Sequence, residues 1–95
     1  MDCKEIVFSR HAIIQMFARK ISKDQVVKVI HNGEVIADYK DDKPLPSKLI
    51  FGIIYNKPLH VVVGYNDNLK KCIVITAYFP DAFIWEPDFK TRRKK

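Results

Sequence analysis

The sequence lacks an apolar run long enough to span a membrane. Its longest apolar runs, such as Ile73-Val74-Ile75, have the length of strands, whereas a transmembrane helix needs about 20 apolar residues. The first five residues also lack the apolar stretch of a secretory signal peptide. We therefore expect a cytoplasmic protein without a membrane partner.

Cysteine is scarce. Cys3 and Cys72 are the only two, they lie far apart, and neither belongs to a C-x-x-C pair. We expect two free thiols in a reducing compartment, with Cys72 a small buried residue of a strand. The cysteines and the three histidines also lack the spacing of a four-ligand zinc site. Neither a metal nor another cofactor is expected.

Acidic residues are too few to balance the basic ones, which gives a net charge of +6. The excess lies at one end, because Lys90, Arg92, Arg93, Lys94 and Lys95 occupy five of the last six positions. Such a tail can bind a phosphate backbone or an acidic partner, or simply keep the protein soluble. We expect one domain over residues 1–89 and a basic tail over residues 90–95.

Two helices are predicted near the start of the chain. Ser9 is the expected N-cap of the first, which ends near Arg19-Lys20. Its buried side should carry four apolar side chains, those of Ala12, Ile13, Met16 and Phe17. Ser22 and Gln25 match a capping box that begins the second helix, over residues 23–32, and Gly33 is the expected left-handed stop.

The period then changes to that of strands. Extended segments are predicted over residues 34–38, 48–55, 59–65 and 71–79, and residues 5–8 fit a short strand or an extended lead-in. Turn-forming residues separate the last three strands. The sequence therefore predicts an α+β fold, with two N-terminal helices packed on an antiparallel sheet of three to four strands.

The segment over residues 79–89 contains three Phe and the only Trp. Large aromatic side chains bury much area, so the segment is expected to fold back over a sheet edge or the helices. The rival interpretation is an exposed strip that binds a partner, including a second copy of the chain in a homodimer.

Polar residues on two kinds of element suggest a site. His11, Gln15 and Arg19 recur at i, i+4 and i+8 along the first helix, and His60 interrupts an apolar strand. Strand alternation places Thr76 and Tyr78 on one face of the last strand. The same alternation places three apolar residues on its other face, Ile73, Ile75 and Ala77.

Whether His60 joins the two hydroxyls depends on the register of the last hairpin. A two-residue turn would pair His60 with Ile75, and a three-residue loop would pair it with Thr76. A clustered site needs the second register, or a β-bulge that achieves the same change of face.

Several motifs in order resemble a small bacterial and archaeal family catalogued as domain of unknown function 4258. They are Phe8-Ser9-Arg10-His11-Ala12, Met16, Arg19, Ile21-Ser22, Asn32-Gly33-Glu34-Val35-Ile36, Pro58-Leu59-His60-Val61-Val62, Ile75-Thr76-Ala77-Tyr78 and Trp85-Glu86-Pro87. The sequence differs from the family in Lys20, where Gly is frequent, and in Ala18, where Glu is frequent. Lys20 is therefore expected in a left-handed conformation.

The resemblance implies a fold similar to RelE and barnase-like ribonuclease toxins, and a toxin-like endoribonuclease of a toxin–antitoxin system. The family's polar signature falls on His11, Arg19, His60, Thr76 and Tyr78. The reaction would need no metal: two imidazoles would share the acid and base roles, Arg19 would hold the phosphate and the two hydroxyls would donate to it.

RNA, alone or in the ribosome, and an antitoxin protein are the partners that this activity implies. Five basic residues would hold the RNA backbone, namely Lys20, Lys23, Lys90, Arg92 and Arg93. Two alternatives stay open. The same fold can be a non-catalytic module that binds a protein or an anion, or His60 can be a core residue and the polar stripe a solvated helix face.

Overall fold

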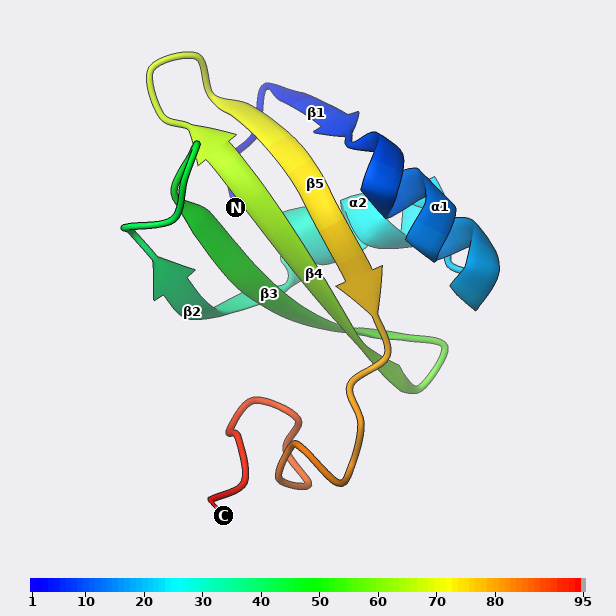
Figure 1. Ribbon diagram of the computed structural model, residues 1–95. Coiled ribbons are helices and arrows are strands. Elements are labelled where there is room, and N and C mark those ends of the chain that lie inside the picture. The colour runs from blue at the N-terminus through cyan, green and yellow to red at the C-terminus, as the bar shows by residue number, and fades with distance from the viewer. Residues whose placement is uncertain (95) are drawn as a thin grey trace.

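Two helices cover one face of a single sheet in the computed structural model, which describes residues 1–94 (Figure 1). Neither helix within that range is long and apolar enough to cross a membrane. The elements in chain order are β1 (Glu5–Phe8), α1 (Arg10–Arg19), α2 (Lys23–Asn32), β2 (Glu34–Tyr39), β3 (Ser47–Ile54), β4 (Lys57–Asn66) and β5 (Lys71–Tyr78).

The sheet has five strands in the order β1-β5-β4-β3-β2. This corrects the expected sheet of three to four antiparallel strands, because β1 adds a fifth strand that runs parallel to β5. The chain leaves β1 at one edge, crosses one face of the sheet as α1 and α2, and enters β2 at the other edge. The α+β class and the two packed helices are confirmed.

Both helices begin where their caps predict. The Ser9 hydroxyl accepts a hydrogen bond from the Ala12 amide at 3.0 Å, and Ser22 and Gln25 form both bonds of the capping box. Lys20 ends α1 in the left-handed conformation, with φ 58°, as expected.

The prediction for Gly33 is wrong, because its φ of −80° is ordinary extended backbone. Glycine is needed there because two backbone carbonyl groups lie too close to leave room for a side chain. A Cβ at this position would meet the carbonyl oxygen of Val29 and would lie 2.5 Å from that of Phe51.

The core lies between the helices and the sheet, and α1 contributes less to it than expected. Ala12 and Met16 are buried, but Phe17 is 87% exposed and Ile13 is exposed as well. The predicted apolar face was too wide, since a ten-residue helix at the sheet edge buries only a narrow stripe. The buried core residues are Ala12, Met16, Ile21, Val26, Val29, Ile30, Ile50, Leu59, Val61, Val63, Cys72, Val74 and Ala77.

The C-terminal segment, residues 80–94, packs at the end of the sheet where β5 finishes (Figure 1). Trp85 is 8% exposed, and its backbone forms an isolated antiparallel β-bridge with that of Arg92. Lys90 binds Glu34 of β2 at 2.9 Å. The segment therefore folds back onto the sheet, as predicted. One of its aromatic side chains, that of Phe83, remains in solvent.

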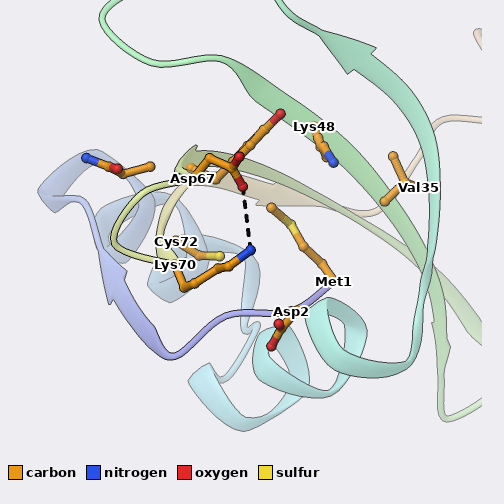
Figure 2. A pocket seen from close by; sticks show the side chains of 9 residues that line it. Met1, Asp2, Val35, Lys48, Asp67, Lys70 and Cys72 are labelled. Carbon is orange, nitrogen blue, oxygen red and sulfur yellow. Dashed lines mark ion pairs between the residues drawn. The ribbon is translucent and has the colours of Figure 1, made fainter.

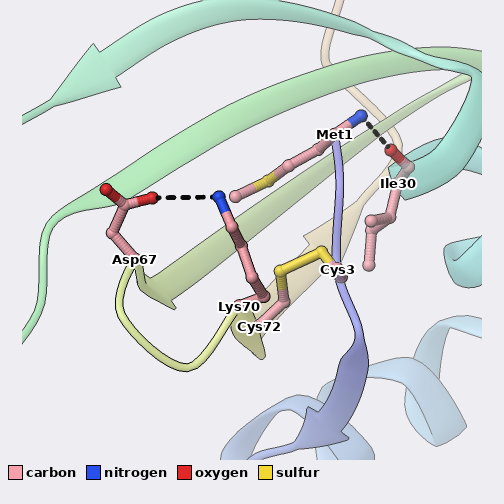
Figure 3. Close-up of a disulfide and its surroundings, with 6 residues drawn as sticks. All are labelled: Met1, Cys3, Ile30, Asp67, Lys70 and Cys72. Atoms are coloured by element: carbon pink, nitrogen blue, oxygen red, sulfur yellow. Dashed lines mark hydrogen bonds and ion pairs between the residues drawn. A yellow bond between two sulfur atoms is a disulfide. The ribbon is translucent and has the colours of Figure 1, made fainter.

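Cys3 and Cys72 form a disulfide, which overturns the expectation of two free thiols. The parallel pairing of β1 and β5 brings their Cα atoms to 5.8 Å although 69 positions separate them in the sequence. Nearby, the Met1 amine donates to the carbonyl oxygen of Ile30 at 2.9 Å (Figure 3). The cysteines therefore no longer indicate a reducing compartment.

Replacing Cys3 by Ser should lower the free energy of unfolding by about 4 kcal/mol, because the bond closes most of the chain into one loop. Urea unfolding with and without a phosphine reductant measures this. The reductant should shift the wild-type curve toward that of Cys3→Ser and leave the variant unchanged. Alkylation of both cysteines in the unreduced folded protein would contradict the disulfide.

Candidate functional site

A β-bulge in β5 sets the faces of the candidate residues. The four-residue loop from Asp67 to Lys70 pairs Asn66 with Lys71, a register that would place His60 opposite Ala77 if it continued. The register shifts after Val63↔Val74, so that Val62 pairs with Thr76 and His60 with Tyr78. Neither of the two expected turn lengths occurs, and the bulge alternative is confirmed.

The bulge also corrects the predicted faces of β5. Ala77 lies in the core beneath the helices, whereas Ile73 and Ile75 line a hollow of about 230 Å³ with Gly64 and the loop over residues 42–45. Simple alternation fails because Ile75 is the extra residue of the bulge. Thr76 and Tyr78 consequently lie on the sheet face away from the helices. His60 of β4 shares this face, because it pairs directly with Tyr78 of β5.

His60 is sealed between the sheet and the C-terminal segment. Its side chain is 0% exposed. Nε2 lies 2.7 Å from the carbonyl oxygen of Phe89 and Nδ1 lies 3.2 Å from the Tyr78 hydroxyl. The Trp85 ring meets the imidazole edge to face, with centroids 4.6 Å apart. A carbonyl can only accept, so Nε2 carries a hydrogen, and in the neutral ring Nδ1 then accepts from the Tyr78 hydroxyl.

This environment favours the neutral form of both side chains. Burial lowers the pKa of His60, and the hydrogen bond to the Phe89 carbonyl raises it by less. Burial likewise raises the pKa of Tyr78. His60 therefore has the bonding of a core histidine with both nitrogens satisfied.

Arg19 reaches β5 from the last turn of α1. Its Nη1 donates to the carbonyl oxygen of Ala77 at 2.8 Å and contacts the Thr76 hydroxyl at 3.5 Å. β1 stops pairing with β5 at Val74. Beyond that point α1 lies along the edge of β5 that β1 no longer covers. Arg19 thus satisfies a backbone acceptor of the strand edge.

His11 stands apart from the other predicted residues. It lies in the first turn of α1 and is exposed. None of the hydrogen bonds found within residues 1–94 connects it to Arg19 or His60. The structure therefore joins four of the five candidates as two pairs, Arg19 with Thr76 and His60 with Tyr78, and leaves His11 separate.

The predicted RNA-binding cations fall into two groups. Lys20 and Lys23 are exposed at the corner between α1 and α2. Lys90, Arg92 and Arg93 belong to the C-terminal segment. There Lys90 binds Glu34, the Arg92 guanidinium lies 5.7 Å from the Trp85 ring, and Arg93 Nε donates to the Ala82 carbonyl oxygen at 2.8 Å.

The sequence prediction missed the residues that close over His60. Trp85 and Phe89 come from the segment after the sheet, and Phe51 is opposite His60 on β3, with ring centroids 6.1 Å apart. The signal was a single histidine in an apolar strand together with the only tryptophan in the chain. A buried imidazole needs partners for both nitrogens, and an aromatic tail offers cover for it.

A second hollow, of about 230 Å³, lies beside the N-terminus and Lys48 (Figure 2). It is at the Asn66–Lys71 end of the last hairpin, opposite the end that holds His60 and Tyr78. Its ion pair, Lys70 with Asp67 at 3.7 Å, is exposed and contributes little stability. None of the five candidate residues lines it.

Fold and site together define a small α+β protein with helices on one face of a mixed sheet and a buried histidine on the other. The chain belongs to the family described as domain of unknown function (DUF4258), whose model matches residues 8–79. The match includes all five candidate residues and ends before the segment that covers His60. No curated protein and no solved structure was found to match the chain.

Burial of His60 predicts a loss of stability in mild acid. The unfolded chain takes up a proton as the pH falls through 6.5, the ordinary pKa, while the folded chain resists until lower pH. More protons then bind the unfolded state, so the free energy of unfolding falls.

His60→Gln should lose this component, because an amide does not titrate. Urea unfolding between about pH 7.5 and pH 5.5, followed by the fluorescence of Trp85, measures both proteins. His31→Gln replaces an exposed histidine of α2 and is the matched control for the loss of an imidazole. Equal slopes for wild type and His60→Gln would contradict a buried neutral imidazole.

Proposed function

We propose that this chain is a non-catalytic RNA-binding module. The observation that carries the proposal is the complete enclosure of His60, whose two nitrogens both have partners and whose side chain has no exposed surface. A general acid or base must come within hydrogen-bonding distance of the substrate. In this structure the imidazole instead holds the C-terminal segment on the sheet.

Arg19 supports the same conclusion. A guanidinium that binds a substrate phosphate offers its planar fork to that phosphate. Here Nη1 is bound to the backbone of Ala77, so Arg19 already fastens α1 to the edge of β5. Its role in this conformation is to position two elements of the fold.

The charge distribution supports RNA as the ligand. Exposed cations occur at the α1–α2 corner, with Lys20 and Lys23, and in the C-terminal segment. Contacts from lysine and arginine to phosphates release counterions, which makes affinity dependent on salt and independent of sequence. The net charge of +6 gives the long-range attraction.

A second candidate is a metal-independent endoribonuclease of a toxin–antitoxin system, with a RelE-like fold. The pairing of Arg19 with Thr76 and of His60 with Tyr78 favours it, since both β5 residues share one face two positions apart. Arg19 would bind the phosphate, and His60 and Tyr78 would move protons. This activity requires the C-terminal segment to leave His60, and an antitoxin or the ribosome would be its partner.

One experiment separates the two candidates. A mixed-sequence RNA and its DNA equivalent, each fluorescently labelled, are incubated with the protein in EDTA at several salt concentrations. Anisotropy reports binding and a denaturing gel reports cleavage. We expect saturable binding of uncut RNA, with an affinity that falls as salt rises.

Lys20→Ala/Lys23→Ala should reduce the slope of log affinity against log salt by about 0.7 for each phosphate that the variant no longer neutralises. Lys40→Ala/Lys43→Ala, which removes the same charge from the loop after β2, is the matched control and should leave the slope unchanged. Cleavage of RNA alone to a 2′,3′-cyclic phosphate would contradict the binding module and establish the nuclease. Absence of RNA binding at low salt would contradict RNA as the ligand.

A further inference from the structure

The outer side of the C-terminal segment presents an aromatic ring among cations. Phe83 is 92% exposed, the most of any large apolar side chain in residues 1–94. It lines a hollow of about 550 Å³ with Ile84, Arg92, Arg93 and Lys94. The volume is in the range of small-molecule sites.

Hydrogen bonds within the segment fix the backbone around Phe83. The Phe83 amide donates to the Asp81 carboxylate at 2.8 Å, and the Ile84 amide donates to the Asp81 carbonyl oxygen at 2.9 Å. The Arg93 amide donates to the Ile84 carbonyl oxygen at 2.8 Å. The backbone that carries the ring is therefore already ordered before a ligand binds, which lowers the entropic cost of binding.

Trp85 holds the same turn against the sheet. Its ring is packed on His60, so Phe83 on one side of the segment is exposed while Trp85 on the other is buried. The segment lies outside residues 8–79, the range of the family match.

The hollow combines an aromatic ring with cations, so it fits a whole nucleotide better than a base alone or a phosphate alone. An exposed aromatic face stacks on any base, and neighbouring cations hold the phosphates of the strand. Arg93 is engaged with Ala82 and with the Glu86 carboxylate at 3.5 Å, so it supports the turn. Arg92 and Lys94 line the hollow beside the ring.

We propose that Phe83, together with Arg92 and Lys94, binds an unpaired nucleotide of single-stranded RNA by stacking on the base and pairing with the phosphate. The inference rests on the proposed function in one respect, that RNA is the ligand. It adds the requirement that the bound base be unpaired, because a base inside a duplex offers no free face.

Anisotropy with labelled oligouridylate of about eight nucleotides and with a blunt RNA duplex tests the site. Phe83→Ala should weaken oligouridylate binding about tenfold and leave duplex binding unchanged. Phe83→Trp should keep the affinity, and its new fluorescence should be quenched when the base stacks. Tyr55→Ala is the control: Tyr55 is 84% exposed, but its hollow is lined by Asp24 and Lys28, and it should bind as wild type does.

Each other outcome overturns the site in a distinguishable way. Wild-type affinity of Phe83→Ala for oligouridylate would overturn the nucleotide site and leave RNA binding intact. Failure of the wild type to bind either RNA would overturn both proposals. A poly-glutamate peptide that displaces the RNA and loses affinity equally in Phe83→Ala would assign the surface to an acidic protein. Urea unfolding of every variant is the control for folding, and we expect curves equal to that of the wild type.

Discussion

The hydrogen bond from His60 Nε2 to the Phe89 carbonyl oxygen ties the C-terminal segment to the sheet. The Phe89 carbonyl can only accept, so Nε2 carries a hydrogen, and in the neutral ring that burial favours, Nδ1 accepts from the Tyr78 hydroxyl. Trp85 adds apolar cover and keeps water from the bond. The segment therefore acquires two sides, an inner one that closes the sheet and an outer one that carries Phe83.

The bulge at Ile75 makes this arrangement feasible, since it turns Tyr78 toward His60 while Ala77 stays in the core. Beyond the point where β1 ends, Arg19 binds the carbonyl of Ala77 and so fixes α1 to the same stretch of strand. Arg19 and His60 thus each bind a backbone carbonyl group of another element of the fold. The proposed ligand contacts are the exposed cations and Phe83, which these bonds leave free of the sheet.

Local chemistry made much of the fold predictable. The caps at Ser9 and Ser22 and the strand periods depend on near neighbours, which the sequence displays directly. The disulfide of Cys3 with Cys72 and the parallel β1 depend on a contact across 69 positions, which no spacing reveals. The exposure of Phe17 depends on how narrowly α1 meets the sheet.

Of the predicted site residues, the structure brings Arg19 to Thr76 and His60 to Tyr78, but it leaves His11 apart. His60 could be singled out as a polar residue in an apolar strand, whereas its enclosure depends on where residues 85–89 fold. The most direct test is a long-range ¹H–¹⁵N correlation spectrum of the His60 ring at neutral pH. The neutral tautomer with hydrogen on Nε2, protected from solvent exchange, is the predicted result. An imidazolium, or a ring in rapid exchange with water, would contradict an enclosed histidine with a structural role.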